Sequence, residues 1–302
     1  MHEPPLPNPE ATMRVAMPYS GAASLMLPGL ILVGLLAAMA GQTGILKLPS
    51  FAPRVAGPEA VTIAARAYAY RATGDFLRDG APVDGPVVAV EHPAPLQIMK
   101  YQVSESDYAL CVADGACKKA DPRRRGKGNL PVTGVNFSDA TDYAEWLSSR
   151  TGATWRLPTV EEWTFAAGSK AGDPALGIET DGRDPAERWL AFYEKEAALG
   201  DNALATPEPL GSGGLNEYGV ADVSGAVWEW TSTCATRTTL DLAGETRALL
   251  ESCGVRYVEG KHRTAMTYFV RDSLTGGCSI GAPPDNLGFR LVREASWLER
   301  FL

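Results

Sequence analysis

The stretch NEYGVADVSGAVWEW, residues 216–230, decides the fold of this chain. It opens with residue types that suit a tight turn, since Asn and Gly tolerate a positive φ. It ends in an apolar strand in which Trp228 and Trp230 flank Glu229. Side chains alternate along a strand, so the two indoles are expected on one face and the carboxylate on the other.

The same stretch holds a candidate cation site. Asp222 and Glu229 stand seven residues apart across a glycine turn. Two carboxylates together with intervening backbone carbonyls form the all-oxygen set that calcium prefers. A tryptophan-rich strand that simply packs in the core explains the same residues without a metal, so both interpretations stay open at this point.

Length and composition bound the remaining possibilities. The chain has 302 residues, of which 45% are hydrophobic and 21% are charged, as in a globular protein with a substantial core. This length allows one large domain or two ordinary ones. The formal net charge of −8 argues against a nucleic-acid-binding surface, so no nucleic acid is expected as a partner.

The N-terminal region has the pattern of an export signal. Arg14 precedes an uncharged run at 21–40, and that run ends in the A-x-A pattern of 38–40. The run is also long enough to span a bilayer, so both a cleaved signal peptide and an N-terminal membrane anchor remain possible. In both cases we expect a periplasmic location, with membrane contact only through this segment. Residues 41–60, rich in Pro and Gly, are expected to form a linker to a domain at 61–302.

Periodicity and capping patterns predict a mixed secondary structure. We expect a strand within 61–71 and two extended segments within 86–103. We expect one helix at 104–111 with Ser104 as its N-cap and a second at 139–150 with Ser138 as its N-cap. Two further helices are expected, one after the Thr159–Glu162 capping box and one at 186–198.

Five cysteines in an exported chain suggest disulfides. Cys111 and Cys117 enclose the end of a helix and a glycine turn, where a local bridge is geometrically easy. Cys234, Cys253 and Cys278 are then an odd set, and we pair Cys234 with Cys253 and leave Cys278 as a thiol. Among the three histidines only His262, flanked by two basic residues, is a candidate for chemistry.

Four segments together resemble the sulfatase-modifying-factor family, which contains the formylglycine-generating enzymes. They are the PVTGVNF strand with its helix, WRLPTVEEWTFAAG, NEYGVADVSGAVWEWTS and NLGFRLV, at 131–146, 155–168, 216–232 and 286–292. The order and spacing match the family from about 61 to 293. The resemblance implies an α+β fold consisting of a single formylglycine-generating-enzyme-type domain, C-type-lectin-like and low in regular structure.

The resemblance also implies site residues. The loop of relatives that binds structural calcium matches this chain at Asp222, Gly225, Val227 and Glu229, with Asp222 in place of an asparagine. The formylglycine-generating enzymes hold copper(I) with a pair of cysteines. Counted back without gaps from the NLGFR motif at 286–290, the matching positions in this chain are His262 and Thr267. Thiolates suit a soft monovalent ion and a hydroxyl does not, so formylglycine generation is not expected.

The stretches CGVRYVEGKHRTAMTYFVRD and GGCSIGAPPDNLGFRLV, at 253–272 and 276–292, look like the exported branch associated with copper nitrite reductase. Two functions of different class follow. The first is an oxidoreductase or maturation factor for a periplasmic protein or peptide, with copper as a possible cofactor. The second is a non-catalytic, calcium-stabilised module that binds a protein or ligand. For the first, the expected cleft residues are His262, Arg263, Tyr268, Arg271 and Cys278.

Overall fold

The computed structural model describes one compact unit of the chain, Ala52–Leu302, within which the placed residues are 56–122, 129–178, 185–198, 206–225, 227–272 and 287–295. The expected signal or anchor at 21–40 and the thiol Cys278 lie outside these residues. Within them, no helix has both the length and the apolar character needed to cross a membrane.

The strands are short except for one central pair. In chain order they are β1 (Ala60–Ile63), β2 (Arg66–Arg71), β3 (Asp75–Arg78), β4 (Ala81–Val83), β5 (Val87–His92), β6 (Leu96–Met99), β7 (Trp155–Arg156), β8 (Trp228–Leu240), β9 (Thr246–Glu259), β10 (Thr264–Thr267), β11 (Leu287–Gly288) and β12 (Val292–Arg293).

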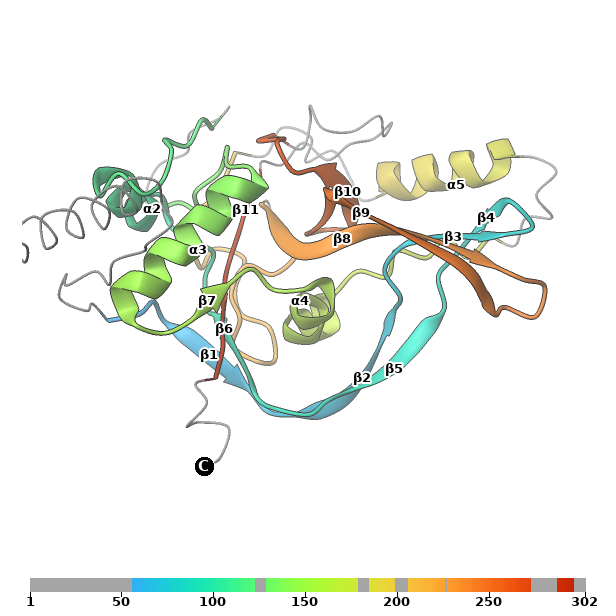
Figure 1. Ribbon diagram of the computed structural model, residues 1–302, viewed down its shortest axis with the longest axis horizontal. Helices are drawn as coiled ribbons and strands as arrows, with labels where there is room; N and C mark the ends of the chain where they lie inside the picture. The colour runs from blue at the N-terminus through green and yellow to red at the C-terminus, as the bar shows by residue number, and fades with distance from the viewer. Residues whose placement is uncertain are drawn as a thin grey trace, which may run out of the picture. The chain divides into compact units, whose positions relative to one another are not determined.

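These strands of the described residues form three sheets (Figure 1). The first has the order β1-β6-β12-β7. The second has the order β10-β9-β8-β3-β4, with β11 beside β8, and its long antiparallel β8–β9 ribbon dominates Figure 1. The third consists of β2 and β5 alone. Because most of the pairings are antiparallel and the helices are segregated from them, the fold class is α+β, as the sequence predicts.

Helix starts follow side-chain capping. The helices are α2 (Glu105–Ala113), α3 (Phe137–Thr151), α4 (Val160–Ala167), the 3-10 turn η1 (Gly168–Lys170) and α5 (Pro185–Ala198). Ser104 accepts a hydrogen bond from the backbone N–H of Asp107, and Thr159 forms the predicted reciprocal box with Glu162. Each cap satisfies donors that the first helical turn leaves without a partner.

Three sequence-based assignments are wrong. The strand expected at PVTGVNF does not form, since this segment has only an isolated bridge at Pro131 and Phe137 begins α3. Helix α3 is capped by Asn136, not by Ser138, because Asn136 and Asp139 exchange side-chain and backbone hydrogen bonds across three residues. The strand expected within 61–71 is two strands, since β1 pairs with β6 whereas β2 pairs with β5. An apolar run alone does not reveal a change of partner sheet.

The core has two parts. The larger packs α2 and α3 against the start of β8 and the ends of β9 and β10; the smaller lies around α4, β1 and β6. Helix α4 contacts both β2 and β8, and Figure 1 shows it between them. The start of β8 is therefore covered on both faces, which explains why Trp228 and Trp230 are each fully buried.

Candidate functional site

Glu229, the carboxylate of the opening stretch, lies at the centre of a buried charge network. Its side chain and that of Arg290 are each 1% exposed, and they form a two-pronged ion pair with distances of 2.6 and 2.7 Å. Gln102 donates to the first carboxylate oxygen at 2.9 Å and the indole N–H of Trp163 donates to the second at 2.8 Å. Burial of two charges is tolerable here because each is paired and hydrogen-bonded.

Calcium ligation by Glu229 does not fit this arrangement. An ionised carboxylate has about four acceptor sites, and Arg290, Gln102 and Trp163 supply four donors to them. A calcium ion would have to displace a donor and lie beside a guanidinium cation. In this structure Glu229 is the counter-ion of Arg290, and its role as a calcium ligand stays a prediction that would require these contacts to change.

Asp222 has a different set of partners. Its backbone φ is +56°, and its carboxylate accepts hydrogen bonds from the backbone N–H groups of Gly211 and Gly213 at 2.6 and 2.8 Å. The close approach of the two chain segments leaves Gly213 little room for a side chain, since a Cβ there would lie 3.1 Å from an Asp222 oxygen. Asp222 therefore holds a neighbouring turn, and calcium at Asp222, Gly225 and Val227 stays a prediction.

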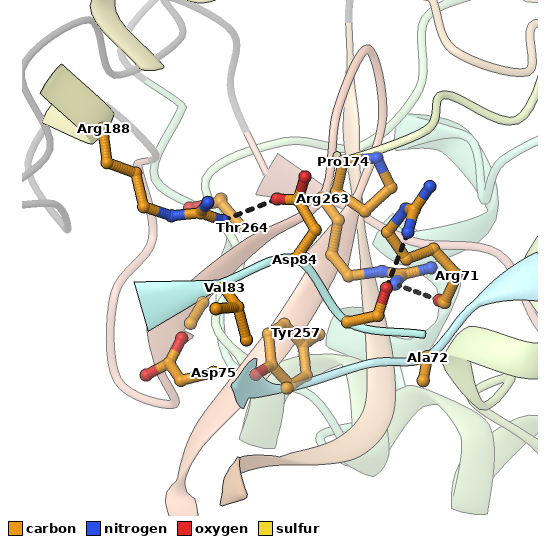
Figure 2. Close-up of a pocket in the computed structure, with 13 residues that line it drawn as sticks. Arg71, Ala72, Asp75, Val83, Asp84, Pro174, Arg188, Tyr257, Arg263 and Thr264 are labelled. Atoms are coloured by element: carbon orange, nitrogen blue, oxygen red, sulfur yellow. Dashed lines mark hydrogen bonds and ion pairs between the residues drawn. The ribbon is translucent and has the colours of Figure 1, made fainter. Parts of the chain in front are cut away.

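A pocket of about 380 Å³ lies beside the start of β10 (Figure 2). It is the candidate functional site, because it contains a residue that the resemblance places in the cleft, Arg263. Thirteen residues from four separate parts of the chain line it: Arg71, Ala72, Gly74, Asp75, Val83, Asp84, Gly85, Pro174, Arg188, Tyr257, Arg263, Thr264 and Ala265.

Ion pairs fix the charged rim of this pocket. Arg188 and Asp84 form an ion pair with an N–O distance of 2.5 Å. A dashed line marks this pair in Figure 2. Burial opposes ionisation of Asp84, but the N–H groups of Leu176 and Gly177 and the Arg188 guanidinium outweigh it and hold the pKa of Asp84 below its usual value. The rim is therefore charged but internally compensated at neutral pH.

A second pocket, of about 340 Å³, adjoins the first across Arg71, Pro174 and Arg263. Its wall is aromatic: Tyr68, Tyr70 and Tyr218 line it. The guanidinium of Arg66 lies 4.0 Å from the ring centroid of Phe165 and 4.3 Å from that of Tyr218, which are cation–π distances. We call the two pockets together the double pocket.

Arg263 is the predicted catalytic residue that the structure places in the double pocket. Its side chain is 7% exposed and pairs with Glu259 at 2.5 Å. It also donates to the backbone carbonyl of Arg71 at 3.1 Å and to the hydroxyl of Thr164 at 3.3 Å. These contacts hold the guanidinium in place, so Arg263 is a fixed part of the wall that the two pockets share.

His262 lies next to Arg263 but against the core. Its ring meets the indole of Trp228 edge to face, with ring centroids 4.5 Å apart. Burial lowers the pKa of His262 to about 4, helped by the charges of Lys195 and Lys261. The imidazole is neutral at pH 7.

The other predicted catalytic residues follow the far end of β10. Tyr268 is 45% exposed, and Arg271 pairs with the buried Asp139 of α3 at 3.1 Å. A four-residue strand separates them from Arg263, about 13 Å at 3.3 Å per residue. The structure therefore does not bring Arg263, Tyr268 and Arg271 into one cluster, and Cys278 lies outside the described residues.

Both predicted disulfides are present in the structure, Cys111–Cys117 and Cys234–Cys253. Copper(I) prefers sulfur ligands. Within the described residues, one group of potential metal ligands comes together, Cys234, Glu251 and Cys253, and both of its sulfurs are in the bridge. The described residues around His262 therefore do not form a copper(I) thiolate pair.

Sequence reasoning missed most of the double pocket. Arg71, Asp84 and Arg188 belong to no motif, and 104 residues separate Asp84 from Arg188. No local signal joins them, because an ion pair between distant segments exists only after the sheets have formed.

Comparison with known protein families identifies the fold. A family profile described as "Sulfatase-modifying factor enzyme 1-like domain" matches residues 47–295. The solved structure of PvdO from Pseudomonas aeruginosa is 24% identical in sequence, covers 79% of this chain and 95% of its own, and superposes with a TM-score of 0.50. The arrangement of helices and sheets is thus shared.

Curated relatives match only part of their own length. The mouse (Mus musculus) protein named inactive C-alpha-formylglycine-generating enzyme 2 is 29% identical over 57% of this chain and 51% of its own length. The formylglycine-generating enzyme of Streptomyces coelicolor is 37% identical over 35% of this chain and 33% of its own. The hercynine oxygenase of Mycolicibacterium smegmatis is 37% identical over 35% of this chain and 22% of its own. The chain thus spans about half or less of each.

Proposed function

Because this chain belongs to the sulfatase-modifying factor enzyme 1-like family, we propose that it binds a polypeptide client and supports its maturation without copper–thiolate oxidation of a cysteine. The observation that carries the proposal is the state of the cysteines. All four described cysteines are in disulfides, and His262 and Thr267 stand where the family resemblance places the reactive pair.

The double pocket supports recognition of a polypeptide. Its lining of arginine and tyrosine side chains has the composition that is enriched in protein–protein contacts. Each pocket is near the lower end of the volume range of small-ligand sites, about 300–1,000 Å³. Two such pockets that share a wall suit two side chains of one extended peptide.

The names of the relatives indicate that proteins similar to this chain differ in activity. They include a protein named as inactive, formylglycine-generating enzymes and hercynine oxygenases. We place this chain with the members that lack formylglycine generation, and we propose export to the periplasm and copper nitrite reductase as the client. An oxidising role through the remaining cysteine, Cys278, is the alternative that the first experiment below excludes or establishes.

The first experiment tests the chemistry. A peptide with the C-x-P-x-R pattern is incubated with purified protein, copper, oxygen and a thiol reductant, and its mass is followed. We expect an unmodified cysteine. Conversion to formylglycine would overturn the proposal, and its loss in Cys278→Ser would identify the responsible thiol.

The second experiment tests binding. A photo-crosslinking amino acid replaces Ala265, an exposed residue of β10 that lines the double pocket. The matched control replaces Ala248, an exposed residue of β9 outside both pockets. Purified copper nitrite reductase should crosslink at position 265 and not at 248. Equal or absent crosslinking at both positions would refute the double pocket as the client site.

A further inference from the structure

The Cys234–Cys253 disulfide lies in an irregular part of the β8–β9 ribbon. Cys234 pairs with Arg256, yet the next residue of β8, Ala235, pairs with Ser252. Cys253 and the two residues after it therefore have no register partner on β8, which is the geometry of a bulge. Bulges redirect side chains out of the regular ladder, and Cys253 is exposed whereas Cys234 is only partly exposed.

The two sulfurs of this bridge have different nearest charges, although the Glu251 carboxylate lies within 4.8 Å of both sulfurs. The guanidinium Nη1 of Arg256 lies 3.0 Å from Cys234 Sγ. A carboxylate oxygen of Glu251 lies 3.5 Å from Cys253 Sγ. A cation beside a sulfur stabilises the thiolate form, and a carboxylate destabilises it.

Arg256 is available to stabilise that charge. Its guanidinium stacks over the ring of Phe137 at 4.5 Å and donates to the carbonyl of Ser232. The carboxylate whose charge acts on Arg256 is that of Glu251, and the side-chain contacts found for Arg256 within the described residues are to Ser232, Cys234 and Phe137. Most other arginines of the fold already face a carboxylate, as Arg263 and Arg290 do.

The second disulfide of the chain provides an internal reference. Cys111 and Cys117 are 0% and 8% exposed and belong to the larger core cluster. Burial limits the approach of an external thiol, most of all to Cys111, so this bridge is expected to exchange more slowly.

We propose that Cys234–Cys253 is a thiol–disulfide exchange site whose substrate is an external thiolate, carried by a polypeptide or by a small molecule. The thiolate attacks Cys253 Sγ and forms a mixed disulfide with it. The Cys234–Cys253 bond breaks, and its electron pair leaves on Cys234 Sγ beside Arg256. A thiolate whose conjugate thiol has a lower pKa is the better leaving group, which fixes the direction of the attack.

A second external thiolate completes the reaction. It attacks the external sulfur of the mixed disulfide and releases Cys253 as a thiolate, which takes up a proton. Two external thiols are thereby oxidised to one disulfide, and the protein bridge is reduced to two thiols. The reverse reaction with an external disulfide restores the bridge.

The test follows each cysteine separately in the oxidised full-length protein. Free thiols are first blocked, the protein is treated with reduced glutathione or with a cysteine-containing peptide, and newly formed thiols are alkylated and mapped by mass spectrometry. We expect Cys234–Cys253 to be reduced at least about ten-fold faster than Cys111–Cys117. The first adduct should be on Cys253, and a faster reaction with the peptide than with glutathione would assign the polypeptide source.

A pair of charge-matched variants isolates the role of Arg256. Arg256→Met removes the cation at Cys234, whereas Arg237→Met removes a mostly exposed cation from β8, the strand that carries Cys234. We expect exchange to slow about five- to ten-fold in Arg256→Met alone, and Arg256→Lys to restore part of the rate. Equal rates in Arg256→Met and Arg237→Met, a first adduct on Cys234, or equal reduction of the two bridges would overturn the proposal.

Discussion

Strand β8 joins two regions with opposite properties. Its first residues, Trp228, Glu229, Trp230 and Thr231, are each at most 1% exposed. Its outer part pairs with residues within 246–252 of β9, and all residues of that range are exposed, including Leu249 at 61%. The first region holds a fixed carboxylate with a full set of donors, and the second holds a disulfide within reach of solvent.

The difference shows how one strand can serve two purposes. In the inner region every polar atom of Glu229 is committed, so a change there affects the whole fold. In the outer region the ribbon contributes few core contacts, so chemistry can change there at little cost to stability. Exchange at Cys253 is compatible with folding for this reason.

The largest effect is expected for Glu229→Gln. This change leaves the Arg290 guanidinium buried without a counter-ion, which costs about 3–5 kcal/mol and lowers the melting temperature by roughly 10 °C. Thermal unfolding in calcium and in chelator measures it, and we expect the same loss in both. A loss seen only in calcium would restore Glu229 as a calcium ligand. Glu91→Gln, at an exposed site on β5, is the control.

The next effect is a pH dependence of the inner region. The pKa of His262 is about 4 in the folded chain and about 6.5 in the unfolded chain. The contribution of neutral His262 to the free energy of unfolding is complete above pH 6.5. It is lost as the pH falls from 6.5 to 4, because His262 binds a proton more tightly in the unfolded chain than in the folded one. The loss amounts to about 3 kcal/mol at most.

Denaturant unfolding between pH 4 and 8 tests this dependence. His262→Gln should flatten that part of the stability curve, with little change in its slope above pH 7. An unchanged slope between pH 4 and 6.5 in the variant would assign the acid sensitivity to other groups.

A smaller effect separates two glycines of the β9 region. A Cβ at Gly260 would lie 3.2–3.3 Å from three atoms of the Trp228 indole, whereas a Cβ at Gly254 would meet nothing within 4 Å. We expect Gly260→Ala to cost about 1–3 kcal/mol, and Gly254→Ala to be neutral or to stabilise by up to about 1 kcal/mol. Urea unfolding of both variants measures the contrast, and equal costs would contradict it.

The smallest effect is expected at the exposed end of the ribbon. Leu249→Ser should change stability by no more than about 0.5 kcal/mol, whereas Val258→Ser, at a fully buried site of the same strand, should cost several times as much. A large loss for Leu249→Ser that depends on protein concentration would mean that a second copy covers the ribbon.

Local patterns predicted a large part of the fold. Ser104 and the Thr159–Glu162 pair were readable as caps because their partners lie three residues away. The Cys111–Cys117 bridge was readable for the same reason. The Asn136 cap shows the limit, since the apolar start of α3 at Phe137 points to no particular residue as its cap.

The site residues were predictable only in part. The family resemblance pointed to the segment around Arg263, and the structure places that residue on the wall between the two pockets. It also pointed to Tyr268 and Arg271, which the length of β10 separates from Arg263. Spacing in sequence does not report the distance between side chains once a strand runs between them.

The sequence by itself determined the family and the α+β class through the order and spacing of its motifs. It also determined the Ser104 and Thr159 caps and the local disulfide, because each of these depends on residues a few positions apart. Only the tertiary structure decided what Glu229 does. Its partners Gln102, Trp163 and Arg290 are 127, 66 and 61 residues away along the chain. Four donors converge on one carboxylate only after the sheets and α4 have packed, and the same packing leaves Cys253 exposed at a bulge.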